Sequence, residues 1–272
     1  MSNSIQFNTF NTLLQKVKEK KPLVHHLTNY VTVNDCANIV LALGASPIMA
    51  DYIGEINDIL PRADALVVNL GTINEQKAET ILKACEIANA NNIPVVLDPV
   101  GIGVSSFRLG ILRKIIGEYK LAVIKGNASE ISIIAGLSGE SKGVDVGLGD
   151  MITPLSLREL SMKLDTVIAL TGPTDYITFG EKTITITNGS KYLAQLTGTG
   201  CMIGSMIGTF ATVTSKYIEA AALGVLIMGV AGDICHDIAQ EDGMGSFKVK
   251  IFDVVSKIDE NVLRKVAKIE NE

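Results

Sequence analysis

The sequence predicts an α/β protein with a mostly parallel central sheet, helices on both faces of that sheet and a helical C-terminal region. Short apolar runs alternate with longer segments of helical period, as in βαβ units whose strands are buried on both faces. After residue 171 this alternation gives way to a hairpin pattern and then to long helical segments. Because no linker, low-complexity tract or repeat interrupts the 272 residues, we expect one domain over residues 1–272.

Six segments have the composition of buried parallel strands. They are short and rich in Val, Ile, Leu and Ala. In chain order they are residues 23–27, 47–49, 65–70, 94–98, 122–125 and 166–171. Beyond them, residues 176–179 and 182–187 alternate in polarity around Gly180 and Glu181, which predicts a hairpin and an antiparallel edge of the sheet.

The segments between and after the strands have helical period. Residues 74–90 predict the clearest helix, since apolar residues recur on one stripe and charged residues surround it. Residues 32–43 predict another helix, which Gly44 ends. After the hairpin we expect helices to the end of the chain, over about residues 198–214, 217–238 and 245–268.

Composition excludes several classes of protein. With 24 Lys+Arg against 29 Asp+Glu, the net charge of -5 argues against a nucleic-acid partner, which usually meets a basic face. The mean hydropathy of +0.32 is high. The most apolar run, residues 220–232, is nevertheless shorter than the roughly 18 to 20 residues that a membrane-spanning helix needs. We therefore expect a protein without a membrane partner, whose excess apolar surface is buried in its core or between subunits.

The N-terminus and the cysteines indicate a cytoplasmic protein. Residues 1–10 lack a basic stretch followed by an apolar one, so they do not resemble an export signal. Cys36, Cys85, Cys201 and Cys235 lie far apart and include no C-x-x-C pair. This spacing suggests neither a zinc site nor a set of disulfides.

Ligands of an open parallel sheet bind beyond the carboxyl ends of its strands, and two of the predicted strands end in polar motifs. Asp98 ends one strand and is followed by Pro and two glycines, which fits either a turn with a solvated Asp or a functional carboxylate. Asn127 and Glu130 follow another strand in the spacing of a helix cap. In the alternative interpretation Glu130 faces the sheet and holds a hydrated Mg2+ beside phosphate groups.

A glycine-rich segment, L-T-G-T-G-C-M-I-G at residues 196–204, precedes a long apolar helix. The N–H groups of the first turn of such a helix form an anion site suited to a phosphoryl group. The segment is neither a Walker A loop nor a dinucleotide-binding fingerprint. Glycines at positions 200, 204 and 208 also predict a small-residue face that packs closely, and both interpretations can hold for one helix.

Cys201 falls in the first turn of that helix, where the helix dipole lowers the pKa of a thiol. A covalent thiol mechanism would require a histidine partner, and the chain has only His25, His26 and His236. The adjacent His25 and His26 point to opposite faces of their strand, so we expect structural roles for them. Asn29, just beyond that strand, could hydrogen-bond a small polar ligand.

Six motifs together resemble the hydroxyethylthiazole kinase family in order and spacing. The resemblance extends over roughly residues 11–267. The motifs are H-L-T-N-Y-V at 26–31, G-A-S-P-I-M at 44–49, D-P-V-G at 98–101, K-G-N-A-S-E at 125–130, T-G-P-T-D at 171–175 and T-G-T-G-C at 197–201. The resemblance implies a ribokinase-like fold and ATP- and Mg2+-dependent phosphorylation of the hydroxyethyl group of 4-methyl-5-(2-hydroxyethyl)thiazole in thiamine salvage. It also implies a homotrimer with the thiazole pocket near the subunit boundary.

The resemblance assigns substrate and catalytic positions. Met49 and Gly198 match positions that contact the thiazole, and Asn29 matches an Asn near the same pocket. Cys201 stands where most ribokinase-like enzymes carry the Asp that acts as general base. Because a thiol is a poorer base for an alcohol than that Asp, we expect base catalysis to contribute little.

The resemblance also assigns nucleotide and metal positions. Lys125 and Thr171 match ATP-binding positions, and Asp98 and Glu130 match the acidic residues that organise Mg2+ and its waters. The family usually has Arg where this chain has Lys125. Lys keeps the charge and loses the bidentate fork of a guanidinium.

Two other functions remain open. One is another ribokinase-like activity: a hydroxymethylpyrimidine kinase, a pyridoxal kinase or the dehydratase that repairs hydrated nicotinamide cofactors, all of which normally carry Asp at the position of Cys201. The other is a non-catalytic sensor of small molecules on the same scaffold. Loss of the acidic residues is expected in a sensor, whereas Asp98 and Glu130 are both present.

Overall fold

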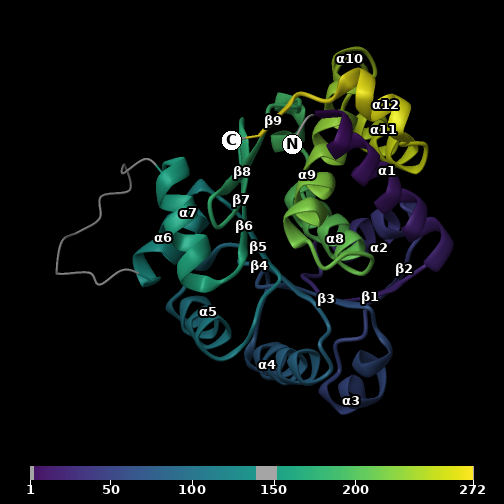
Figure 1. Ribbon diagram of the computed structural model, residues 1–272. Helices are drawn as coiled ribbons and strands as arrows, with labels where there is room; N and C mark the ends of the chain where they lie inside the picture. Colours follow the sequence, from purple (N-terminus) through teal and green to yellow (C-terminus); the bar gives the residue numbers. More distant parts are fainter. Residues whose placement is uncertain (1–2, 139–151, 272) are drawn as a thin grey trace.

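A mixed sheet of nine strands forms the centre of the computed structural model, which describes residues 3–138 and 152–271 (Figure 1). Its spatial order is β2-β1-β3-β4-β5-β6-β7-β8-β9. Strands β1 to β6 pair in parallel, and β7, β8 and β9 add to one edge in antiparallel fashion. The strands are β1 (Leu23–Leu27), β2 (Ser46–Ile48), β3 (Ala65–Asn69), β4 (Val95–Asp98), β5 (Val123–Asn127), β6 (Val167–Thr171), β7 (Asp175–Phe179), β8 (Lys182–Ile186) and β9 (Ile269–Asn271).

Helices cover both faces of the sheet and enclose one hydrophobic core on each side (Figure 1). The α-helices are α1 (Asn3–Lys20), α2 (Val33–Ala42), α3 (Ile56–Ile59), α4 (Glu75–Ala90), α5 (Ser106–Glu118), α6 (Ala128–Ser138), α7 (Pro154–Leu164), α8 (Thr199–Ala211), α9 (Tyr217–Ile234), α10 (His236–Glu241), α11 (Met244–Ser256) and α12 (Glu260–Val266). The 3₁₀ helices are Ile53–Glu55, Leu60–Arg62, Ile102–Val104 and Lys191–Gln195. Helices α3 to α7 supply the core of one face, and α1, α2, α8, α9, α11 and α12 that of the other.

Helix α8 lies directly on the sheet because its glycines allow a close approach. A Cβ atom added at Gly208 would collide with Val67 of β3, and one added at Gly204 would lie 3.8 Å from Asp98 of β4. This confirms the small-residue face predicted for the helix. The packing brings the first turn of α8 to the carboxyl ends of the central strands.

The predicted strand order along the chain and the hairpin are confirmed, but the chain is not helical to its end. The segment expected as one helix over residues 217–238 breaks at Cys235, and the segment over 245–268 breaks before Asp259, whose side chain accepts a hydrogen bond from Val262 N at 2.8 Å and caps α12. The last described residues form β9, in which Ile269 pairs with Ile186 and is buried. Burial of this one apolar residue at the open edge of β8 favours the strand.

Helix α9 is long and apolar enough to cross a membrane by length and composition. Of its 18 residues, 72% are buried inside the protein, where the helix contacts α8 and the sheet. Such burial is typical of the core helix of a soluble protein. The membrane argument from sequence counted only the apolar run 220–232, whereas the whole helix Tyr217–Ile234 meets the length and composition criterion.

Candidate active site

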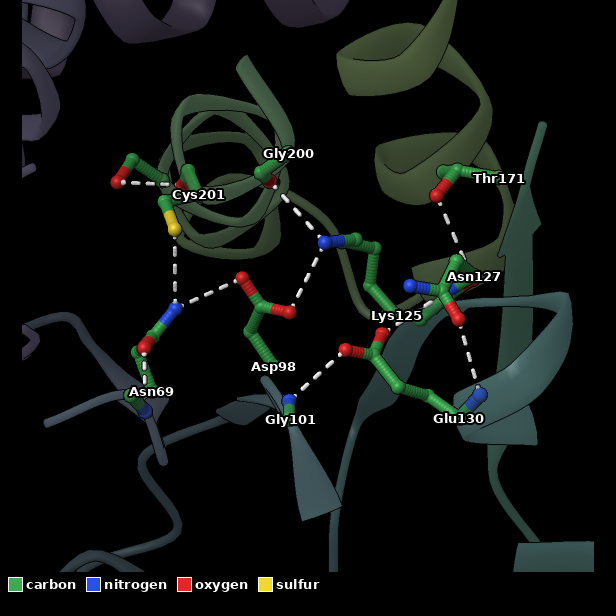
Figure 2. A network of polar contacts seen from close by, with 12 residues as sticks. Asn69, Asp98, Gly101, Lys125, Asn127, Glu130, Thr171, Gly200 and Cys201 are labelled. Carbon is green, nitrogen blue, oxygen red and sulfur yellow. Dashed lines mark hydrogen bonds and ion pairs between the residues drawn. The ribbon is translucent and has the colours of Figure 1, made fainter. Parts of the chain in front are cut away.

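Polar residues lie at the carboxyl ends of the central parallel strands, as the sequence predicts. Asn69 of β3 and Asp98 of β4 are direct neighbours in the strand register. Lys125 lies on β5, and Gly200 and Cys201 lie in the first turn of α8. Figure 2 shows Asn69 and Lys125 reaching Asp98 from either side, while Cys201 and Gly200 at the start of α8 lie above them.

Asp98 and Lys125 form a buried ion pair. Lys125 Nζ lies 2.9 Å from Asp98 Oδ1, and the two side chains are 5% and 1% exposed. Burial raises the pKa of the Asp98 carboxyl, and the charge and hydrogen bond of Lys125 counteract this rise. Burial alone would lower the pKa of Lys125, but the charge and hydrogen bond of Asp98, together with the charges of Glu130 and Cys201, outweigh burial and raise this pKa. Lys125 therefore offsets part of the cost of burying the Asp98 carboxyl group away from water.

Lys125 also reaches the glycine-rich helix start, because its Nζ donates to Gly200 O at 3.2 Å. The ammonium is thus held between Asp98 and α8 inside the protein, and only about a twentieth of the side chain is accessible. The structure brings Lys125 to the phosphoryl end of the predicted site. Thr171, the other predicted nucleotide residue, ends β6 and donates through Oγ1 to Gly126 O at 3.4 Å.

Glu130 fulfils the cap prediction and makes one contact beyond it. Glu130 N donates to Asn127 Oδ1, and Asn127 N donates to Glu130 Oε2, both at 2.9 Å, which is a reciprocal capping box. The second carboxylate oxygen, Oε1, accepts from Gly101 N at 3.0 Å. Glu130 therefore joins the start of α6 to the loop that follows Asp98.

Helix α8 begins without a side-chain cap. Gly198 is its N-cap residue and has φ +95°, a conformation that favours glycine. A Cβ atom at this position would lie 2.8 Å from Cγ2 of Thr32. Because no side chain caps the helix, the first-turn N–H groups and the positive end of the helix dipole are left available to an anionic ligand at the carboxyl ends of the central strands.

Cys201 is held by two amides. Its Sγ accepts from Asn29 Nδ2 at 3.4 Å and from Asn69 Nδ2 at 3.3 Å. Burial and the charge of Asp98 raise the pKa of this thiol, more than the hydrogen bond with Thr32, the charge of Lys125 and the hydrogen bond of Asn29 lower it. The uncharged thiol is therefore the favoured form, contrary to the lowering expected from the helix dipole alone.

The histidines do not supply a base for Cys201. In the described part of the chain, His236 Nδ1 lies 2.9 Å from Ser190 Oγ, His25 Nε2 lies 2.7 Å from Ala50 O, and His26 Nδ1 lies 3.0 Å from Val24 O. Both strand histidines are buried in β1, which agrees with the structural roles expected for them. The geometry does not support a covalent thiol mechanism with a histidine partner.

The predicted site residues thus fall into a connected network and outlying positions. Asn29, Asp98, Lys125 and Cys201 belong to one network of hydrogen bonds and ion pairs, and Glu130 meets it at the loop after Asp98. Gly198 starts the helix above that network, while Met49 lies half-buried just after the edge strand β2. Sequence analysis missed Asn69, which connects the network. Its signal was an Asn at the end of an apolar strand, followed two residues later by Gly.

The carboxylates suit a cation that keeps its own waters. No group of three or more His, Cys, Asp or Glu residues that could hold a metal occurs in residues 3–138 and 152–271. Glu130 and Asp98 act on each other as like charges, and Glu130 contributes to the raised pKa of Asp98. Mg2+ typically binds one or two carboxylates together with water and phosphate oxygens. These two acidic residues fit that pattern.

The fold is that of a ribokinase-like protein, and its candidate site combines an uncapped helix start with a buried ion pair. A ribokinase-like superfamily protein from Enterococcus faecalis has the same fold, with a TM-score of 0.64 and 14% identity over 92% of this chain and 95% of its own. A model of the hydroxyethylthiazole kinase family matches residues 14–261. This chain belongs to the hydroxyethylthiazole kinase family, and it is a kinase.

Two relatives support this membership over nearly the whole chain. A hydroxyethylthiazole kinase from Clostridium beijerinckii is 46% identical over 274 aligned residues, which cover 99% of each chain. The structure of a hydroxyethylthiazole kinase protein from Pyrococcus horikoshii has a TM-score of 0.88 and 35% identity, and the match covers 97% of this chain and 99% of that one. The resemblance found in the six motifs is therefore confirmed.

Proposed function

We propose that this kinase transfers the γ-phosphoryl group of ATP to the hydroxyethyl group of 4-methyl-5-(2-hydroxyethyl)thiazole, a step of thiamine salvage. The observation that carries the proposal is the uncapped start of α8 above the buried Asp98–Lys125 pair. The chain that has this geometry is 46% identical to a hydroxyethylthiazole kinase. The family relationship supports the substrate, and the geometry supports the reaction.

Phosphoryl transfer depends mainly on positioning and on stabilisation of negative charge. The N–H groups at the start of α8 would face the transferred group, and Lys125 would place a positive charge beside the same turn through its contact with Gly200. Asn29, Met49 and Gly198 would bind the thiazole alcohol, and Thr171 would bind the nucleotide on the β6 side. Lys125 acts in this scheme from inside the protein, as a charge that both Asp98 and α8 hold in place.

Asp98 and Glu130 would hold Mg2+. When bound, the ion neutralises charge on the phosphate groups. The chain's own contribution is to keep two carboxylates ready in a region where burial strengthens electrostatic interactions. Lys125 balances the charge of Asp98, and the N–H groups of Gly101 and Asn127 hold both oxygens of Glu130.

Cys201 would contribute little as a general base. Its thiol is favoured in the uncharged form, and two amides already donate to its sulfur. The alcohol proton would leave late, once bonding to phosphorus has made the alcohol oxygen acidic, and it would pass to an oxygen of the transferred phosphoryl group or to water. This interpretation agrees with the expectation from sequence that positioning outweighs base catalysis.

The assembly and location of the kinase extend the proposal. We expect one domain over residues 1–272, and Asn271 at the end of β9 donates to Gln6 Oε1 of α1 at 2.8 Å. All four cysteines are free thiols, which suits the reducing cytoplasm. Tyr30, Val31 and Tyr52, which are 75%, 56% and 61% exposed, follow the predicted substrate residues Asn29 and Met49 in the chain. They are suitable contacts for a homotrimer, which light scattering on the purified protein would test by its mass.

The experiment that tests the proposed function is an ATP-consumption assay with Mg2+. Hydroxyethylthiazole, hydroxymethylpyrimidine and pyridoxal are offered separately to the purified protein, and the products are identified by mass. We expect phosphorylation of the thiazole alone. Phosphorylation of another alcohol would contradict the substrate assignment, and no turnover with any of the three would favour the sensor hypothesis.

A further inference from the structure

Asn69 is the point at which the predicted metal site and the predicted acceptor site meet. Its Nδ2 donates to Asp98 Oδ2 at 2.8 Å and to Cys201 Sγ at 3.3 Å. Its Oδ1 accepts from Asn29 Nδ2 at 3.0 Å and from Gly71 N at 2.9 Å. The side chain is buried, with 1% of its surface exposed, so all these contacts are made away from solvent. Figure 2 shows Asn69 reaching both Asp98 and Cys201.

Backbone donors determine which way the two amides point. Gly71 N can only donate, so the atom of Asn69 that faces it must be the oxygen, and Nδ2 must face Asp98 and Cys201. Thr32 N donates to Asn29 Oδ1 at 3.1 Å, which in the same way turns the Nδ2 of Asn29 toward Asn69 and Cys201. The sulfur of Cys201 therefore receives two N–H donors.

The space around these amides is closed on the side of Gly71. A Cβ atom at Gly71 would lie 2.9 Å from Asn69 Oδ1 and 3.1 Å from Asn29 Cβ. Gly71 has no positive φ, so its backbone would accept an alanine and the collision would fall on the two amides. The chain thus restricts these amides to one arrangement both by hydrogen bonds and by packing.

We propose that Asn69 is a positioning residue for phosphoryl transfer, which sets the place of the Asp98 carboxylate relative to Cys201 and the start of α8. The inference rests on the proposed function, which gives Asp98 and α8 their roles. It adds a residue that touches neither substrate in this scheme and acts through Asp98 and Cys201. It also gives Asn29 a second role, as the partner that completes the pair of donors on the sulfur.

The discriminating variant is Asn69→Asp. The new side chain has almost the same shape and keeps the oxygen that accepts from Gly71 N and Asn29 Nδ2. It replaces the donor to Asp98 and Cys201 by a second acceptor. A residue that only supports the loop at Gly71 would tolerate this change, whereas a positioning residue would not. Asn92→Asp, at an exposed turn after α4, is the matched control because it adds the same charge.

Two measurements are made on the full-length protein. In steady-state kinetics, Asn69→Asp should lower kcat about tenfold or more, because a hydrogen bond to a charged group is lost, and leave KM for the thiazole nearly unchanged. In the second, iodoacetamide labels Cys201, the cysteine that is not fully buried, at a fixed alkaline pH. Labelling should slow in Asn69→Asp, because a donor that favours the thiolate becomes a repelling acceptor. Asn92→Asp should match the wild type in both measurements.

A second variant keeps the test decisive if Asn69→Asp does not fold. Gly71→Ala should displace the two amides and also lower kcat more than it changes KM. Its control, Gly110→Ala on α5, introduces a methyl group where nothing lies within 4 Å. A folded Asn69→Asp with the kcat of the wild type would overturn the proposal, and so would wild-type kcat in Gly71→Ala. If the wild type does not phosphorylate the thiazole but Asn69→Asp still slows labelling, the proposed function fails and the amide contacts stand.

Discussion

Helices α6 and α8 both begin at the carboxyl ends of the parallel strands, where the candidate site lies. Their first turns differ in how the backbone N–H groups are capped. The start of α6 is closed by its own side chains, because Asn127 and Glu130 accept each other's backbone N–H groups. The start of α8 has Gly198 at the N-cap and no side-chain cap. Two backbone N–H groups at the start of α6 are thus satisfied by side chains of the protein, whereas no side chain caps the start of α8, whose N–H groups are available to a ligand.

This difference suggests that the two helix starts beside the site have different roles. A closed helix start can position a carboxylate, and Glu130 uses its second oxygen to hold the loop after Asp98. An open start with a positive charge beside it can hold the group that is transferred, and Lys125 supplies that charge at Gly200. The account therefore predicts different results when either start, or the ion pair beneath α8, is altered.

The largest effect is expected from Asp98→Asn, which removes the charge beneath the open start. Lys125 would remain buried without a counter-charge, and breaking a buried pair in this way costs about 3 to 5 kcal/mol. We expect turnover to be lost together with this stability. Urea unfolding and the kinase assay would measure both effects. Asp253→Asn, in the exposed pair with Lys250, is the control and should change stability by less than about 1 kcal/mol.

Gly198→Ala should show whether the uncapped start of α8 serves turnover beyond the cost of placing an alanine at a positive φ. An alanine at positive φ costs about 1 to 2 kcal/mol. Here its Cβ would also press on Thr32 and displace the first turn of α8, so we expect turnover to fall about tenfold or more. Gly243→Ala is matched, since Gly243 is the N-cap of α11 at φ +89° with nothing within 4 Å. Equal turnover in the two variants would contradict the role of the α8 start.

Glu130→Gln should show whether the closed start also serves the metal. Glutamine can accept from only one of Gly101 N and Asn127 N, so stability should fall by about 1 kcal/mol. We expect the Mg2+ concentration for half-maximal turnover to rise several-fold. Asn127→Ala removes the cap alone and should lower the melting temperature to a similar extent at unchanged Mg2+ dependence. The same Mg2+ dependence in both variants would limit Glu130 to its structural role.

Much of the fold can be predicted from the sequence because buried parallel strands consist of short apolar runs. Residues 65–70 and 94–98 predict β3 and β4 to within a residue at each end. Strand β9 escaped prediction, since it is only three residues long and contains one apolar residue, Ile269. Its existence depends on the unpaired edge of β8, which is far away in the chain. The break at Cys235 was missed for a related reason, because the apolar pattern continues across it.

The site could be predicted only as a set of candidates. Each strand-end residue is visible in the sequence, but their partners are not, since Lys125 pairs with Asp98 across 27 positions and Asn69 meets Cys201 across 132. That Lys125 is buried inside the protein cannot be deduced from the presence of Lys at a position where the family usually has Arg. The raised pKa of Cys201 likewise depends on burial and on the charge of Asp98, neither of which the argument from the helix dipole includes.

The most direct test of the central claim, that positioning by α8 and the buried network outweighs base catalysis, is the turnover of Cys201→Ala under saturating thiazole, ATP and Mg2+. The account predicts a loss well below the 10² to 10⁴-fold that removal of a general base typically causes. It also predicts that Cys201→Asp retains or exceeds wild-type turnover, because the amides of Asn29 and Asn69 can donate to a carboxylate at this position. A loss of 10²-fold or more in Cys201→Ala, together with an inactive Cys201→Asp, would contradict it.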